Sequence, residues 1–195
     1  FVVGARGTDD YYILKLNGQD GSTITRLGFS PEAQAYSVVG LRSTIDPEGI
    51  LYVAGEFSSY FGTGGFVARH NPGTLAQEWI HTFNSFGAPM RVETDRFGNV
   101  YVFSSRNLDS VPELHKLSAI DGTVEWTWTG PSGTGAVAVD LDFDFQGNPH
   151  VLYSNTSAPT SWNTVKIDAE SGTAVWSATV ADGRASDMKI DQADG

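Results

Sequence analysis

The sequence predicts an all-β chain built from repeats, and three observations support this. The 195 residues include 22 glycines and 12% aromatic residues, a composition typical of short strands joined by many turns. One segment, in which a Gly follows an Asp by three positions and a Val follows it by seven, occurs three times at a spacing of 49 residues. No segment of about ten residues has a convincing helical pattern.

The repeated segment joins an Asp to an alternating apolar run. Its copies are DPEGILYVAG from Asp46, DRFGNVYVFS from Asp95 and DFQGNPHVLY from Asp144, and DQADG from Asp191 begins a fourth. An Asp carboxylate can accept backbone N–H groups in a turn, where Gly also takes a positive φ. We therefore interpret this segment as the turn between the first two strands of each repeat, and not as a binding loop.

A second repeated segment places a basic residue ten positions before a Trp. The pairs are Arg69 with Trp79, Lys116 with Trp126 and Lys166 with Trp176, and a degenerate copy without the Trp covers residues 13–25. Asp-Gly or Ser-Gly between the two positions predicts a hairpin turn. Each repeat is thus predicted to hold four short strands in about 40 to 50 residues, which is the size of one β-propeller blade.

The sequence therefore predicts a single β-propeller domain of four repeats over residues 1–195. The repeats cover approximately 187–195 plus 1–36, then 37–86, 87–135 and 136–186. The N-terminal FVVGARG matches a second strand, and the C-terminal MKIDQADG matches a first strand and its turn. Two arrangements follow: a ring closed by pairing of the N- and C-terminal strands, or a segment of a larger propeller.

The stretch GILYVAGEFSSYFGTGGFVARHNPGTLAQEW, from Gly49 to Trp79, resembles the secreted bacterial β-propeller repeat (SBBP) family. The units KLSAIDGTVEW and KIDAESGTAVW are similar to pyrroloquinoline-quinone-like (PQQ-like) propeller repeats. The resemblance implies a secreted protein, extracellular or on the cell surface, often one module of a long chain without a shared chemistry. Quinone-dependent dehydrogenases of similar fold are expected to use a larger ring, calcium and often adjacent cysteines, and this chain has no Cys.

The charge of the chain narrows the choice of partners. It carries 23 acidic against 12 basic residues, for a formal net charge of -11, and so repels nucleic acid and anionic lipid surfaces. No run of about 18 apolar residues predicts membrane insertion. The chain begins at Phe1 without a signal peptide, so we expect a mature form or a piece of a longer chain.

Three carboxylates form the strongest acidic feature. Asp140, Asp142 and Asp144 alternate along a predicted strand and would share one face, in partial agreement with a calcium loop. Counted from Asp142, position 12 is Tyr153, where a calcium loop of that type has a bidentate Glu. We favour a structural turn here and keep a calcium site as the alternative. No other cofactor is predicted.

The loops between second and third strands vary most among the repeats, and function tends to lie on variable loops held by a rigid scaffold. Their candidate binding residues are Tyr11, Tyr12, Tyr60, Phe61, Arg106 and Trp162. Asn155 begins a glycosylation sequon, Asn-Thr-Ser, in the same set. The four histidines are scattered and no nucleophile motif is present, so no catalytic residue is predicted.

These observations predict a non-catalytic extracellular or cell-surface β-propeller module for protein or glycan recognition or scaffolding. Its partners would be a protein or glycan ligand, or neighbouring modules of a longer chain. Two alternatives remain open: a fragment of a propeller enzyme, quinoprotein-like or lyase-like, and a structural subunit of a surface filament or layer.

Overall fold

All regular secondary structure in the described part of the chain is β-sheet. The computed structural model describes residues 1–6, 10–31, 35–84, 86–106, 110–132, 135–157 and 160–191. These residues form 15 strands in four antiparallel sheets, so the predicted all-β class is confirmed. No helix long and apolar enough to cross a membrane is found among them.

Each sheet is a meander in which strands pair in sequence order. The first sheet has three strands: β1 (Val2–Arg6), β2 (Asp10–Leu16) and β3 (Thr23–Phe29). The second comprises β4 (Ala35–Ile45), β5 (Leu51–Ser59), β6 (Gly62–His70) and β7 (Gln77–Phe83). The third comprises β8 (Phe86–Thr94), β9 (Val100–Arg106), β10 (Pro112–Leu117) and β11 (Val124–Thr129). The fourth comprises β12 (Ala136–Phe143), β13 (Pro149–Asn155), β14 (Ser161–Ile167) and β15 (Ala174–Ala181).

The repeated Asp holds the turn between the first two strands of a repeat. Oδ1 of Asp95 accepts the backbone N–H groups of Phe97 and Asn99, both at 2.9 Å. Its Oδ2 accepts the side-chain amide of Asn99 at 2.7 Å, and Gly98 takes φ +83° between them. The same two backbone contacts recur at Asp46 and Asp144. The interpretation of this segment as a structural turn is confirmed.

The hydrophobic core consists of three clusters, one between each pair of neighbouring sheets. Because side chains alternate along a strand, each middle sheet contributes to two clusters. On β9, Val102 packs toward the second sheet, whereas Tyr101 and Phe103 pack toward the fourth. The core therefore lies between the sheets, and each sheet is stabilised by its neighbours.

A second set of contacts crosses each sheet boundary at the hairpin turns. The indole Nε1 of Trp79, in the second sheet, donates to the carbonyl of Ala119 in the third at 3.1 Å. Trp126 of the third sheet donates to Ala169 of the fourth at 3.2 Å. The basic partner in each repeat uses the same carbonyl: Arg69 to Ala119 at 3.1 Å, and Lys116 to Ala169 at 3.3 Å. We call this repeated Trp and basic-residue contact the turn lock.

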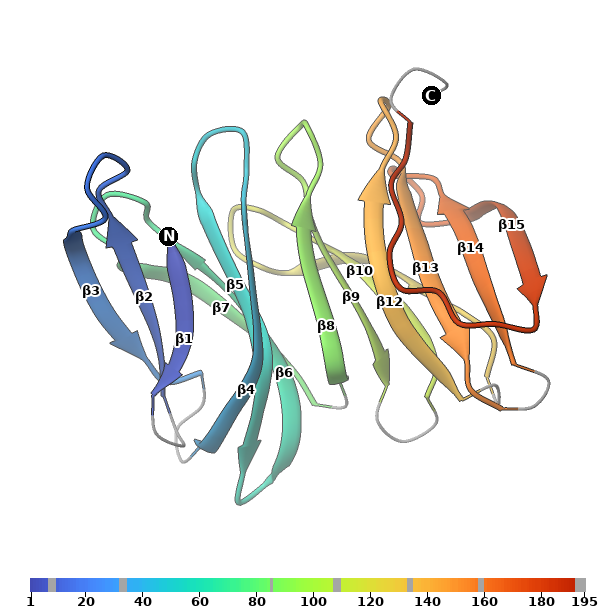
Figure 1. Cartoon of the computed structure of the whole chain (residues 1–195), viewed down its shortest axis with the longest axis horizontal. Coiled ribbons are helices and arrows are strands. Elements are labelled where there is room, and N and C mark those ends of the chain that lie inside the picture. The colour runs from blue at the N-terminus through green and yellow to red at the C-terminus, as the bar shows by residue number, and fades with distance from the viewer. Residues whose placement is uncertain are drawn as a thin grey trace.

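The four sheets stand side by side in sequence order, from β1–β3 at one end to β12–β15 at the other (Figure 1). The first strand β4 contacts β8, and β8 contacts β12. Within the described residues the first sheet has three strands, and residues 185–190 do not pair with β1. Instead, the N–H of Ala185 donates to Ser154 Oγ at 3.2 Å. Of the two predicted arrangements, the ring closed within one chain is therefore not the one that the structure has.

We predict that replacing the turn Asp destabilises the whole array. Asp95 is 2% exposed, and Asp95→Ala would leave two backbone N–H groups and an amide without their acceptor. The expected loss in free energy of unfolding is about 3 kcal/mol, measured by urea denaturation. Asp121→Ala is the matched control, because this Asp is exposed and bonds to Thr123 and Ser118 within a hairpin turn, so its loss should be clearly smaller. Equal losses for the two variants would contradict this account.

Candidate functional site

Two of the predicted loop residues lie in the first sheet and not on a loop. Tyr11 and Tyr12 belong to β2, and Tyr11 is fully buried, with its hydroxyl 3.0 Å from Nε2 of His70. Tyr12 is half-buried, and the guanidinium of Arg26 lies 4.2 Å from its ring centroid. The prediction that these two rings belong to a loop surface is wrong, because the strand begins at Asp10 and takes both residues into the sheet.

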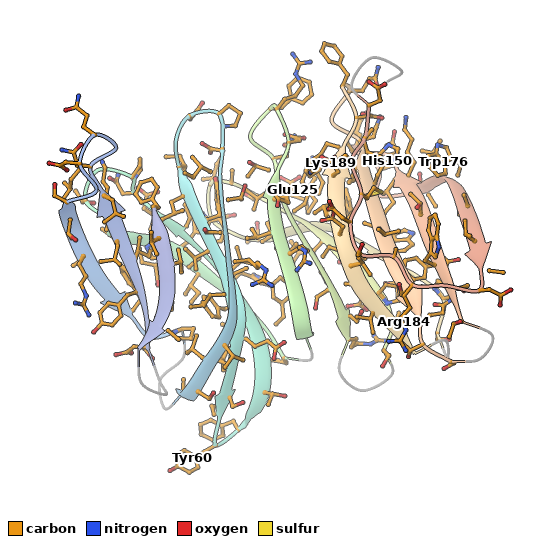
Figure 2. The ribbon with its side chains drawn as sticks, viewed as in Figure 1. Tyr60, Glu125, His150, Trp176, Arg184 and Lys189 are labelled. Atoms are coloured by element: carbon orange, nitrogen blue, oxygen red, sulfur yellow. The ribbon has the colours of Figure 1, made fainter. Side chains whose placement is uncertain are left out.

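Tyr60 and Phe61 form the tip of the β5–β6 hairpin, and each is 83% exposed. Tyr60 projects from the end of the molecule opposite the Asp turns (Figure 2). Arg106 ends β9, and its Nη1 lies 3.2 Å from Oε1 of Glu113 on the neighbouring strand. The structure therefore presents the two aromatic rings to solvent but holds Arg106 in an ion pair.

Trp162 and Asn155 lie at the start of β14 and the end of β13. Trp162 is half-buried on the strand and not in the loop as predicted, and Gly183 lies against it. Asn155 is half-buried, and its side-chain amide donates to Ser161 Oγ at 3.0 Å. Glycosylation of Asn155 stays a prediction.

Asp140, Asp142 and Asp144, the three carboxylates at the end of β12 and just after it, make separate contacts. Asp140 accepts the backbone N–H of Met188 and Asp142 accepts that of Ile190, both at 2.9 Å. Asp144 caps its turn and lies 2.7 Å from Nζ of Lys166. Across the described ranges, no three His, Asp or Glu side chains are grouped as metal ligands. Calcium binding stays a prediction.

The first strands also carry charges that meet across sheet boundaries. Arg91 Nε on β8 lies 3.9 Å from Oδ1 of Asp140, and Thr44 donates to Glu93 at 3.2 Å. Burial raises the pKa of Glu93. Burial also raises the pKa of Asp140, and a hydrogen bond with the Asp187 carboxyl raises it further. Because these carboxylates contact neighbouring strands and residues 187–190, their contacts join the sheets to the C-terminal segment.

A groove between the third and fourth sheets was missed at the sequence level. Its volume is about 510 Å³, and it lies near the end of β11 and the start of β14. The lining residues are Trp128, Thr129, Gly130, Pro131, Tyr153, Asn163, Val165, Ala174, Ser177 and Thr179. The lining contains no charged side chain. Trp162, which precedes Asn163, points to the other face of β14 because side chains alternate along a strand.

The groove borders the position where a Gly replaces a repeated Phe. Four positions after the repeated Trp position, the first sheet has Phe29 and the second has Phe83. The ring centroid of Phe29 lies 5.6 Å from that of Tyr11 in its own sheet. The ring centroid of Phe83 lies 5.0 Å from that of His115 in the third sheet. The third sheet has Gly130 at this position. A Cβ on Gly130 would lie 2.6 Å from Pro112 and 3.0 Å from the Trp128 ring, so these two side chains fill the place of the missing Phe, and Trp128 lines the groove. Aligning QEWIHTF with VEWTWTG would have given this signal.

The polar chemistry of the groove centres on a buried amide. Asn163 is 7% exposed, and its Oδ1 accepts the hydroxyl of Thr179 at 2.6 Å. Its Nδ2 has no hydrogen-bond partner among the described residues, and a buried donor left unpaired costs about 1 to 3 kcal/mol. The ring centroids of Trp128 and Tyr153, which line the same groove, lie 6.4 Å apart. A ligand with hydroxyl oxygens and an apolar face would satisfy both the donor and the rings.

Comparison with known proteins supports the fold and leaves the family open. No protein-family model matches the chain, and no curated protein matches it in sequence. Among solved structures, it is similar to 1,3Gal43A, an exo-β-1,3-galactanase from Clostridium thermocellum, with a TM-score of 0.51 and 14% sequence identity. The match covers 91% of this chain and 47% of that chain, so this chain spans about half of the galactanase chain. At this identity the likeness shows a shared all-β fold alone.

We predict a pH-dependent contribution from the Asp144–Lys166 pair. Burial opposes ionisation of Asp144, but the hydrogen bond from Lys166 and those from Asn148 outweigh it and lower its pKa to about 2. A pKa lowered by folding stabilises the protein above the ordinary value of 3.8 and loses this effect as pH falls toward 2. Lys166→Met should therefore cost on the order of 1 kcal/mol of unfolding free energy at pH 6 and less at pH 2.

The control for this pair is Lys189→Met. The Lys189 side chain is 78% exposed and lies 3.6 Å from Asp142, so its removal should have a smaller effect at pH 6. Urea denaturation of both variants over this pH range measures the difference. A cost of Lys166→Met that stays constant from pH 6 to pH 2 would contradict the assignment.

Proposed function

We propose that this chain is a non-catalytic glycan-recognition module and that the groove between the third and fourth sheets is its binding site. The observation that carries this proposal is the unpaired Nδ2 of Asn163, buried in a groove beside Trp128. An oxygen of a bound sugar would accept from this amide, while the less polar face of the sugar ring would cover the indole. The hydroxyl groups of Ser177 and Thr179, on the strand next to Asn163, add polar groups to the same wall.

The ligand class follows from charge and size. The lining has no charged side chain and the chain has a formal net charge of -11, so a neutral glycan is favoured over an acidic polysaccharide. A volume of about 510 Å³ lies in the range of small-molecule pockets. The galactanase with a similar fold makes β-1,3-linked galacto-oligosaccharides a reasonable first probe.

The proposal includes the finer assignments of the fold and location. The four sheets are interpreted as blades of a β-propeller, in keeping with four-stranded repeats that contact through their first strands. A secreted or cell-surface location and membership in the SBBP or PQQ-like repeat families belong to the same proposal. Hydrolysis by a propeller enzyme is the alternative. The hydrogen bonds that Asp140 and Asp142 accept from the C-terminal segment favour recognition over this chemistry.

We predict that Asn163→Leu and Trp128→Ala each weaken binding of a neutral oligosaccharide at least about tenfold. The first removes the free donor while keeping similar volume, and the second removes the stacking ring. Isothermal titration against a panel of neutral oligosaccharides, including β-1,3-linked galacto-oligosaccharides, measures affinity. Tryptophan fluorescence reports on Trp128, and sugar release from the same panel tests hydrolysis.

Two controls separate the groove from other exposed aromatic residues. Trp162→Ala removes an indole from the opposite face of the strand that carries Asn163, and Tyr60→Ala combined with Phe61→Ala removes the hairpin tip. Neither should change affinity. The proposal fails if no neutral glycan binds, or if binding is lost in the hairpin variant and kept in Asn163→Leu. Release of sugar by the wild type would favour the enzyme.

A further inference from the structure

The fourth sheet carries the donor half of a turn lock that has no acceptor sheet. Trp176 pairs with Lys166 across β14 and β15, as Trp126 pairs with Lys116 in the third sheet. Trp176 is 44% exposed, and every residue of β15 is exposed. Lys166 contacts Asp144 of its own sheet. Trp176 lies against His150 at the outer face of the array (Figure 2).

The first sheet carries the matching acceptor half. By register, Gly18 corresponds to Ala119 and Ala169, whose carbonyls accept from the Trp and basic residues of the preceding sheets. Gly21 corresponds to Gly122 and Gly172. A Cβ on Gly122 or Gly172 would lie only 2.6 or 2.7 Å from the indole of Trp79 or Trp126, so the ring requires a Gly beneath it. Apart from Gly21 and its two chain neighbours, no heavy atom of the described residues lies within 4 Å of the same position at Gly21.

The exception in the series shows that Trp and Gly occur together. The first sheet has Thr25 at the Trp position, and the second sheet has Leu75 where Gly122 and Gly172 lie in the next two. Leu75 is fully buried with φ +62°, so this turn accepts a side chain when no indole covers it. Trp176 and Gly21 are therefore the residue types that a turn lock requires, but they lie at opposite ends of the array and do not contact each other.

Strand edges at the two ends match as well. Among the described residues β1 pairs only with β2, which leaves its other edge without a partner strand there. Residues 185–190 lie beside the fourth sheet as β12 lies beside the third, because Ala185 donates to Ser154 as Ala138 donates to Ser105. If these residues paired with β1 as β12 pairs with β13, then Met188 would oppose Val2. Val2 is 45% exposed on this edge.

We propose that the fourth sheet docks onto the first sheet of a second copy of this chain. Trp176 would cover Gly21 of the second copy and donate to its Gly18 carbonyl, and residues 185–190 would pair with its β1 to complete a four-stranded sheet. A second copy is the occupant because the first and fourth sheets of one chain stand at opposite ends of the array (Figure 1). The contact is head to tail, so it generates a ring or a filament.

The test compares the mass of the wild-type assembly with that of variants that introduce the Thr and Leu found at the boundary of the first and second sheets. Sedimentation velocity over a range of concentrations should give multiples of 21.0 kDa. Trp176→Thr should weaken association at least about tenfold, and so should Gly21→Leu, which places a side chain under the incoming indole. Combining the two recreates the Thr25 and Leu75 pair, so the double variant should lose less than the two single losses predict. Phe61→Thr removes an aromatic residue elsewhere that is more exposed than Trp176, and it should change nothing.

Disulfide trapping tests the strand register. The chain has no cysteine, so Val2→Cys combined with Met188→Cys places the only two thiols at the expected pair. Oxidation should link separate copies covalently, and Val2→Cys combined with Arg184→Cys should not give this yield. Circular dichroism checks that each variant is folded.

Three results would overturn the proposal. The first is a wild-type chain that stays monomeric at every concentration. The second is association that Trp176→Thr does not weaken. The third is a disulfide formed within one chain, which would mean that the occupant is the first sheet of the same molecule. None of these depends on glycan binding, so this proposal and the proposed function can fail separately.

Discussion

The indole N–H of a Trp in one sheet, donated to a turn carbonyl in the next, joins sheets whose strands do not pair with one another. A two-dimensional sheet stabilises itself only within its own plane, so the spacing between sheets must come from side chains. Trp79 and Trp126 supply a large apolar ring and a directed N–H at once, and the Gly beneath each ring allows close approach. The core clusters, the groove and the exposed ends all depend on how neighbouring sheets are placed by this contact.

The same constraint explains how a repeat fold acquires a site. Two sheet boundaries contain a Phe four positions after the repeated Trp position, and the third boundary has Gly130 there. The turn lock is kept at this boundary, and Pro112 and Trp128 fill the place of the missing ring. Trp128 and the unpaired amide of Asn163 line the groove there. The candidate site thus lies at the sheet boundary where single residues break the repeat.

The sequence predicted what repetition encodes. The spacing of Asp46, Asp95 and Asp144 predicted the turns, and alternation predicted the strands that follow them. Single residues that break the repeat were harder to interpret. Tyr11 looked like part of a loop, but β2 begins one residue earlier and buries it. The groove was missed because its lining comes from strands of two different sheets, and Asn163 has meaning only once its partners in space are known.

The central claim is that the turn lock holds the array together, and Trp126→Ala tests it most directly. Measured by urea denaturation, this substitution should lower the free energy of unfolding by about 3 to 5 kcal/mol, because it removes the ring over Gly172 and the donor to Ala169. A loss below about 1 kcal/mol would contradict the account, because a change of that size is typical of a surface substitution.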